Sequence, residues 1–335
     1  MSHLTTPLTV GTLELGTRLV MPPMATAKAD ADGRVTEALL AYYDEKSRGG
    51  AIGLVITEHC YVARQGMNRL GQPSVADDEA VEGLTQLAAL IHRNGCKAAV
   101  QINHCGAASD PAATGLDVVA PSAVQLPGRP GALPRALTRA DIGHIAQAFA
   151  DAARRVQAAG FDAVEIHAAH GYLLSQFLSP LTNQRADEYG GDIHGRIRAH
   201  LEVIAAVRGA VGDAFPVLLR LGACDYLDGG VSIEDGVAAA GAFERAGVDM
   251  LDITGGLRGY VRPGHDEPGF FAELSEAIKK VVSLPVILTG GVTQAQQAEV
   301  LLDDGKADLI GVGRAILKDS EWAVRAVRLL EDSAS

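Results

Sequence analysis

The chain has 335 residues, of which 47% are hydrophobic and 21% charged, as in a globular protein with a full core. A net charge of −12 argues against a nucleic-acid partner. No apolar run approaches the roughly 20 residues of a membrane span, and the N-terminus lacks a secretory signal pattern. The four cysteines (Cys60, Cys96, Cys105 and Cys224) are scattered without a CxxC pair, so we expect buried structural thiols rather than disulfides or a metal site. A cytoplasmic protein fits these features.

Residues 8–19 alternate between glycine breaks and predict a short β-hairpin, placed to cap the bottom of a barrel. After it, apolar strand-like runs alternate with amphipathic helical windows. The predicted strands cover residues 19–24, 53–58, 97–103, 162–167, 217–221, 249–254, 285–289 and 308–312. The predicted helices cover residues 36–48, 78–93, 139–159, 193–211, 233–246, 270–281, 293–303 and 321–330.

This pattern of about eight βα units predicts a closed parallel barrel. Glycines placed as left-handed caps follow several predicted helices, namely Gly95, Gly160, Gly247 and Gly305. A doubly wound open sheet would instead carry a Gly-rich dinucleotide turn after its first strand, where this chain has Met-Pro-Pro-Met at residues 21–24. We predict an α/β fold, a (β/α)8 TIM barrel with an N-terminal hairpin cap, as one domain over residues 1–335.

Barrel enzymes place their sites at the C-terminal ends of the strands. Polar groups and glycines stand at that end of every predicted strand. They are residues 22–26, Glu58 and His59, residues 101–104, residues 167–172, Arg220, residues 254–256, residues 289–291 and residues 311–314. This convergence indicates a site.

The end of the fourth predicted strand carries His167, His170 and Tyr172. A lone histidine here would more often be a satisfied core residue, but three such groups at one strand end favour a site. Two neutral imidazoles can donate to one oxygen and stabilise its growing negative charge. A tyrosine, with an ordinary pKa of about 10, is a proton donor at neutral pH. This combination suits reduction of a C=C bond conjugated to a carbonyl, and a cofactor must carry the hydride.

The segment His-x-x-His-Gly-Tyr, followed by residues 176–180 and then Asn183, Arg185, Asp187 and residues 189–191, resembles the signature of the old yellow enzyme family. The resemblance implies an FMN-containing, NAD(P)H-dependent ene-reductase on a single barrel. It also implies that His167 and His170 bind the activating oxygen of the substrate and that Tyr172 donates the proton. We expect Asn183, Arg185, Asp187 and Tyr189 to scaffold the loop behind Tyr172.

The flavin roles implied by the resemblance agree with side-chain chemistry. Arg220 can stabilise the negative charge that reduced FMN gathers at N1–C2=O, and Gln101 can both donate to and accept from the pyrimidine edge. An ion pair of Arg220 with Glu165 or Asp225 is the structural alternative. Glycine-rich ends of strands seven and eight match the phosphate site of many barrels. The remaining flavin contacts come from the first two strands, and the full predicted set is Pro22, Pro23, Met24, Ala25, His59, Gln101, Arg220, Gly290, Gly291, Gly313 and Arg314.

The chain departs from the family pattern at Ala25, where Thr or Cys usually contacts the flavin O4. Thr26 could substitute if the register is shifted by one residue. Residues 22–30 and 56–59 resemble a subgroup whose longer members add an iron–sulfur cluster and C-terminal domains. The cysteine cluster of those members is missing here, so we expect a barrel-only version.

The glycine-rich loop 255–269 is either an ordinary surface loop or a lid in which Arg258 contacts substrate. The interpretation is an FMN-dependent NAD(P)H oxidoreductase for α,β-unsaturated carbonyl compounds, without a metal, nucleic acid or membrane partner. A dehydrogenase or demethylase with the same site is the first alternative. A flavin-free phosphate-binding isomerase or aldolase is the second, although Lys28 and Lys97 are poorly placed as its catalytic bases. The physiological substrate, the choice between NADH and NADPH, and a homo-oligomeric state stay open.

Overall fold

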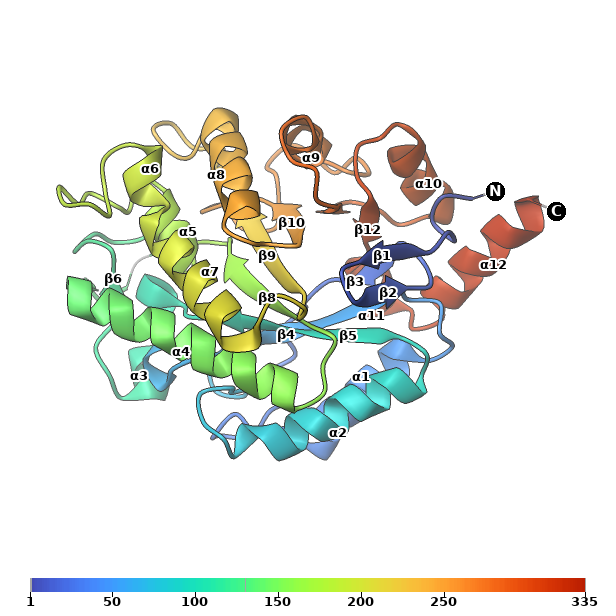
Figure 1. The fold of residues 1–335 in the computed structure, drawn as a ribbon, viewed down its shortest axis with the longest axis horizontal. Coiled ribbons are helices and arrows are strands. Elements are labelled where there is room, and N and C mark those ends of the chain that lie inside the picture. The colour runs from blue at the N-terminus through green and yellow to red at the C-terminus, as the bar shows by residue number, and fades with distance from the viewer. Residues whose placement is uncertain (1, 130, 335) are drawn as a thin grey trace.

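A computed structural model describes residues 2–129 and 131–334 of the chain. Its centre is a closed barrel of parallel strands in the order β10-β11-β12-β3-β4-β5-β8-β9, surrounded by helices (Figure 1). The barrel strands are β3 (Leu19–Met21), β4 (Leu54–Tyr61), β5 (Lys97–Asn103), β8 (Ala163–Ala168), β9 (Val217–Gly222), β10 (Met250–Thr254), β11 (Val286–Thr289) and β12 (Leu309–Gly311). The predicted TIM barrel is confirmed, with each expected strand in place.

The longer helices that follow the strands are α1 (Glu37–Ser47), α2 (Ala80–Arg93), α4 (Arg139–Ala158), α7 (Arg198–Val211), α8 (Ile233–Arg245), α9 (Ala272–Lys279), α10 (Ala295–Asp303) and α12 (Trp322–Ala334). Side-chain caps fix several starts. The Thr138 hydroxyl, for example, accepts from the Asp141 N–H while the Asp141 carboxylate accepts from the Thr138 N–H. The four predicted cap glycines all have positive φ angles, between 68° and 97°.

Short elements that the hydrophobic pattern did not predict stand in the connections. They are α3 (Pro111–Thr114), α5 (Leu173–Leu178), α6 (Ile193–Arg196), α11 (Arg314–Lys318), the 3-10 turns Arg64–Gly66 and Gly106–Ala108, and the small sheet of β6 (Val119–Ala120) and β7 (Arg135–Ala136). The single helix predicted over residues 193–211 is wrong, because α6 ends at Arg196 and α7 begins at Arg198. Ile197 lies between them with φ −87° and ψ −5°.

The predicted hairpin is present as β1 (Leu8–Val10) paired with β2 (Leu13–Leu15). Its buried side chains Val10, Leu13 and Leu15 pack into one apolar cluster with the first inward-facing residues of the strands. Those strand residues are Val20, Leu54, Ala99, Ala163, Leu218, Met250, Ile287 and Leu309, among others. The hairpin therefore closes the N-terminal end of the barrel, and Figure 1 shows both chain ends emerging on one side of the molecule.

Above this apolar layer the interior of the barrel becomes polar. Side chains of a strand alternate between the inside and the outside, so the residue two positions after an inward apolar residue also faces inward. That position is Gln101 in β5, Glu165 in β8, Arg220 in β9, Asp252 in β10, Thr289 in β11 and Gly311 in β12. Gln101, Glu165, Arg220 and Asp252 are at most 4% exposed, and Thr289 is partly exposed. A polar floor thus lies directly beneath the C-terminal ends of the strands.

Strand β4 runs to Tyr61, three residues beyond its predicted end, because its pairing with β5 shifts register between Thr57 and Cys60. Such a bulge re-aims side chains at a barrel rim, here Glu58 and His59. All four cysteines are free and buried, as predicted. No helix in the described ranges has the length and apolar character that crossing a membrane requires.

Candidate active site

One cavity of about 510 Å³ opens at the C-terminal ends of the strands. This volume lies within the usual range for cofactor and ligand sites. Every residue predicted to bind cofactor lines it, together with His167, His170 and Tyr172. The other lining residues are Arg69, Thr254, Tyr260, Phe270, Thr289, Val292, Thr293, Gly311 and Leu317. The sequence-based set therefore converges on one place.

His167, His170 and Tyr172 form a compact group at the end of β8. The ring centroid of His167 lies 5.0 Å from that of His170 and 5.1 Å from that of Tyr172, both edge to face. His170 has a φ of 60°, an uncommon conformation for a residue with a side chain, and Gly171 follows with 72°. This left-handed turn brings His170 and Tyr172 back over the end of the strand. Such local strain is a recognised feature of functional sites.

Both histidines are neutral at physiological pH. Burial, reinforced by neighbouring positive charge, holds the pKa of His167 and of His170 well below the ordinary 6.5. The Nδ1 of His167 accepts from the backbone N–H of Ala169 at 3.2 Å, so its proton resides on Nε2. The Nε2 of His170 lies 3.1 Å from the Thr254 hydroxyl. Neutral imidazoles of this kind donate hydrogen bonds without carrying a full charge.

The phenol of Tyr172 is held by a neighbouring loop. Asn68 Nδ2 donates to Tyr172 Oη at 3.2 Å, which leaves the phenolic hydrogen available to the cavity. Burial is the main reason that the pKa of Tyr172 is raised above 10. The side chain is therefore an acid, not a base, throughout the neutral range.

His59 adds a third imidazole to this group. Its ring centroid lies 5.2 Å from that of Tyr172. Its Nδ1 lies 3.0 Å from Gln72 Nε2 and 3.2 Å from Asn103 Nδ2, so two amides donate to it and the proton sits on Nε2. Burial lowers the pKa of His59 to about 3. His59 thus presents a neutral donor to the cavity.

A buried polar network forms the cavity floor. Gln101 Nε2 donates to Glu165 Oε1 at 2.7 Å, and Arg220 Nε lies 3.2 Å from Asp252 Oδ2. The structural alternative paired Arg220 with Glu165 or Asp225, and it named the wrong carboxylate, because the ion pair is with Asp252. Asp252 on β10 is the register partner of Arg220 on the adjacent strand β9. Asp225 instead accepts hydrogen bonds from Ser179, Val231 and Leu257.

Glycines line the end of the cavity next to β11 and β12, where a Cβ would crowd neighbouring segments of the chain. Gly291 has a φ of 70°, and a Cβ there would lie 2.3 Å from the Glu267 carbonyl oxygen. At Gly313 a Cβ would lie 3.2 Å from the Met24 sulfur. Gly290 and Arg314 complete this end. Backbone N–H groups that can be approached closely, with an arginine beside them, suit a phosphate group.

Ala25 lines the cavity, and Thr26 does not replace it. The Thr26 hydroxyl donates to Glu58 Oε1 at 2.6 Å, and the Thr26 N–H donates to Glu58 Oε2 at 2.8 Å. Glu58 is 2% exposed, so this pair is a fixed structural contact. The alternative register, with Thr26 directed to the cavity, is therefore not supported.

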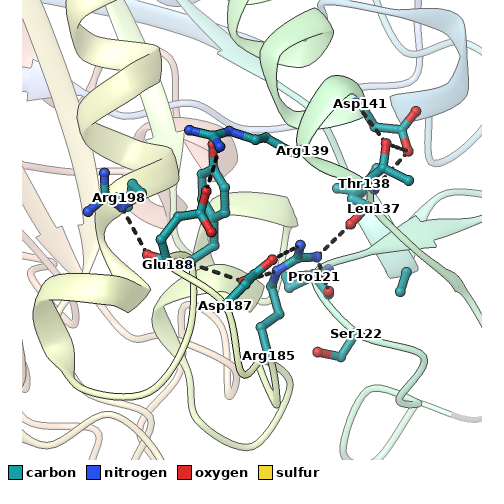
Figure 2. Close-up of polar contacts among 12 residues, drawn as sticks. Pro121, Ser122, Leu137, Thr138, Arg139, Asp141, Arg185, Asp187, Glu188 and Arg198 are labelled. Carbon is teal, nitrogen blue, oxygen red and sulfur yellow. Dashed lines mark hydrogen bonds and ion pairs between the residues drawn. The ribbon is translucent and has the colours of Figure 1, made fainter.

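The motif residues that follow Tyr172 form the expected scaffold (Figure 2). Arg185 donates to the carbonyl oxygens of Pro121 and Leu137 at 2.8 and 2.5 Å and pairs with Asp187. Asn183 Nδ2 donates to the carbonyl oxygens of Phe177 and Tyr189, both at 2.7 Å. Because Phe177 belongs to α5, which starts directly after Tyr172, these bonds stabilise the backbone behind that residue.

Arg258 is exposed and lies outside the cavity lining, in contrast to its expected substrate contact. From the same loop Tyr260 reaches the cavity, with its ring centroid 6.0 Å from that of His170. Sequence reasoning also did not assign roles to Asn68, Arg69 and Asp252. Strand alternation could have indicated Asp252, since it lies two positions before Thr254 at the strand end and therefore faces the same side. Asn68 and Arg69 had none, because they follow β4 in an irregular loop.

Together, the barrel, its strand-end cavity and the neutral donors beside a phenol define an oxidoreductase site that holds a nucleotide-type cofactor. The chain belongs to the NADH:flavin oxidoreductase / NADH oxidase family, whose model matches residues 3–333. It is 41% identical over 95% of its length to the NADH oxidase of Thermoanaerobacter brockii, of which it spans 49%. It is 36% identical over 98% of its length to the NADPH dehydrogenase of Geobacillus sp. (strain WCH70), of which it spans 95%. The solved old yellow enzyme homologue from Zymomonas mobilis matches with a TM-score of 0.86 and 29% identity, over 98% of this chain and 92% of that one.

The chain thus spans about half the length of the Thermoanaerobacter relative. Family membership makes FMN the cofactor, which removes the flavin-free alternative. The residues present fit this group. The cavity combines an amide that both donates and accepts, a buried guanidinium, and a glycine-lined end with Arg314.

Proposed function

We propose that the chain reduces the activated C=C bond of α,β-unsaturated carbonyl compounds with electrons from NADH or NADPH. The observation that carries the proposal is the grouping of two neutral imidazoles and one protonated phenol, with ring centroids 5.0 and 5.1 Å apart. Two imidazole N–H groups can polarise a carbonyl by donating to its oxygen, and alkene reduction also needs a proton on the α-carbon. We also propose that residues 1–335 act as one FMN-binding unit.

In this proposal each side chain has one task. His167 and His170 bind the carbonyl oxygen and stabilise the negative charge that develops on it. Tyr172 delivers a proton to the α-carbon. Bound FMN supplies the hydride chemistry that no side chain can provide.

The cofactor contacts are proposed from the cavity geometry. Gln101 and Arg220 would hold the pyrimidine edge of FMN, with Arg220 offsetting negative charge there. Residues 22–25 and His59 would lie along the ring system. Gly290, Gly291, Gly313 and Arg314 would hold the phosphate.

The test compares Tyr172→Phe with a matched control, Tyr226→Phe. Tyr226 donates to Glu273 at 2.9 Å and is not part of the cavity lining. Loss of a positioned proton donor should slow 2-cyclohexenone reduction by about 10²- to 10⁴-fold, with reduction by NAD(P)H unchanged. The control should keep its rate. Unchanged alkene turnover in Tyr172→Phe, together with normal phenol binding by a His167→Ala, His170→Ala variant, would overturn the assignment.

A further inference from the structure

The cavity has an unusual charge for an acidic protein. Its described lining contains three arginines, Arg69, Arg220 and Arg314, and no carboxylate side chain, although the chain carries a net charge of −12. Arg220 is paired with Asp252 in the floor, and Arg314 stands at the glycine-lined end. Arg69 has no role in the proposed function. Within residues 2–129 and 131–334 its guanidinium forms no ion pair, although its charge acts on the buried Glu58 carboxylate.

The loop that carries Arg69 is firmly attached to the catalytic group. The adjacent Asn68 donates to Tyr172 Oη at 3.2 Å. Gln72, which is 2% exposed, accepts from the Asn68 N–H at 2.9 Å and donates to the His59 carbonyl oxygen at 3.2 Å. Arg69 therefore stands at the Tyr172 side of the cavity on an anchored backbone, while its own side chain is exposed and free to meet a ligand.

A second arginine reinforces the positive charge at this side. The charges of Arg129 and Arg69 both oppose the burial-driven rise in the pKa of Tyr172. Arg129 is exposed, as Arg69 is. A ligand that enters toward Tyr172 thus meets positive charge in a protein that is otherwise acidic. Such an arrangement attracts anions and disfavours cations.

We propose that Arg69 binds a carboxylate of the alkene substrate, at the end remote from the carbonyl oxygen that His167 and His170 hold. The guanidinium matches a carboxylate through two parallel N–H···O bonds. The substrate class is then an α,β-unsaturated carbonyl compound with a second, ionised group. This inference rests on the proposed function for its reaction, but the anion site itself can be tested by binding alone. The phosphates of NADH or NADPH are the other source of anionic oxygens at this place.

The first experiment measures binding to the FMN-loaded protein through changes in its visible spectrum. The two ligands are 4-hydroxybenzoate and its methyl ester, whose phenol oxygen can occupy the position between the two histidines. Arg69→Gln should weaken binding of the acid by about tenfold and leave the ester unchanged. Arg64→Gln, which removes another exposed arginine just before this loop, should change neither. The acid preference of the unaltered protein should also shrink at high salt. An equal effect of Arg69→Gln on both ligands, or none, would overturn the proposal.

The second experiment compares turnover of monomethyl fumarate and dimethyl fumarate, and separately reduction by NADH and by NADPH. Arg69→Gln should lower kcat/KM for the monoester about tenfold and spare the diester and both nucleotides. Arg69→Lys should retain part of the preference, since it keeps the charge. A loss confined to NADH or NADPH would overturn the proposal and assign Arg69 to a nucleotide phosphate. If neither ester is reduced while the acid preference in binding depends on Arg69, the proposed function fails and the anion site stands.

Discussion

Gln101 Nε2 donates to Glu165 Oε1 at 2.7 Å. Gln101 is 1% exposed and Glu165 is fully buried. The two residues are register partners on adjacent strands. A carboxyl oxygen accepts here, so the amide group of Gln101 is fixed with its nitrogen toward Glu165. Its carbonyl oxygen is then the end available to a ring N–H in the cavity. Glu165 is therefore a positioning residue for the flavin contact that we propose for Gln101.

Above about pH 8, where Glu165 is ionised and can only accept, replacing it by Gln should remove this orientation, because a second amide can either donate or accept. We expect FMN to bind about tenfold more weakly, measured by quenching of its fluorescence, and the flavin midpoint potential to shift. The exchanged pair Gln101→Glu, Glu165→Gln restores a hydrogen bond of the same shape. It should recover thermal stability without recovering FMN affinity. Wild-type affinity and potential in Glu165→Gln would contradict a positioning role.

The same glutamate should make stability depend on pH. Burial, with the nearby Asp252 carboxylate, raises the pKa of Glu165 from 4.5 to about 8. The folded protein therefore binds a proton that the unfolded chain has released, and stability falls as pH rises from about 4.5 to about 8. Glu165→Gln should reduce the loss in the free energy of unfolding between about pH 4.5 and 8 by up to a few kcal/mol. Urea unfolding with saturating FMN measures this free energy. Equal slopes in the two proteins would show that Glu165 does not titrate in this way.

Asn68 should affect proton delivery without affecting the first half-reaction. Asn68→Leu removes the donor that holds Tyr172 Oη, and loss of about 1 kcal/mol of hydrogen bonding corresponds to a roughly fivefold slower alkene reduction. Asn68→Asp should be slower still, since a carboxylate would accept the phenolic hydrogen. Rapid mixing measures the two half-reactions separately. Slower oxidation of NAD(P)H in either variant, with alkene reduction unchanged, would reverse the assignment.

Ala25 follows β3 at the position where the family resemblance implies a Thr or Cys that contacts the flavin. Thr26 is already bound to Glu58, so only a change at position 25 can introduce a hydroxyl or thiol there. We expect Ala25→Thr or Ala25→Cys to raise the flavin midpoint potential, with a gain of about 1 kcal/mol for one neutral hydrogen bond to the reduced state. Ala25→Val tests the effect of size alone. A spectroelectrochemical titration that finds the same potential in all four proteins would refute this prediction.

The barrel and most of its site could be predicted because both follow from local patterns. Strand alternation places Gln101, Arg220 and His167 inside the barrel, and parallel strands bring their ends to one rim. The Gly171 bend after β8 also marks where the chain turns back over the strand. Those features lie within a few residues of each other in the sequence.

Contacts between distant segments could not be predicted in the same way. The Arg220 partner depends on which neighbouring strand offers a carboxylate in register, and the choice between Asp252 and Glu165 is a matter of barrel packing. Arg69 reaches the cavity from an irregular loop with no hydrophobic period. Arg258 lies in a loop whose path depends on a distant contact, the hydrogen bond from the Leu257 N–H to Asp225. The residue type of Arg258 therefore did not indicate where its side chain lies.

The most direct test of the account is an anaerobic visible titration of the purified protein. NADH or NADPH is added first, and 2-cyclohexenone follows. We predict a yellow flavin band that bleaches with the nucleotide and returns with the enone. A band that bleaches with the nucleotide but does not return after addition of either the enone or monomethyl fumarate would contradict the proposed alkene reduction.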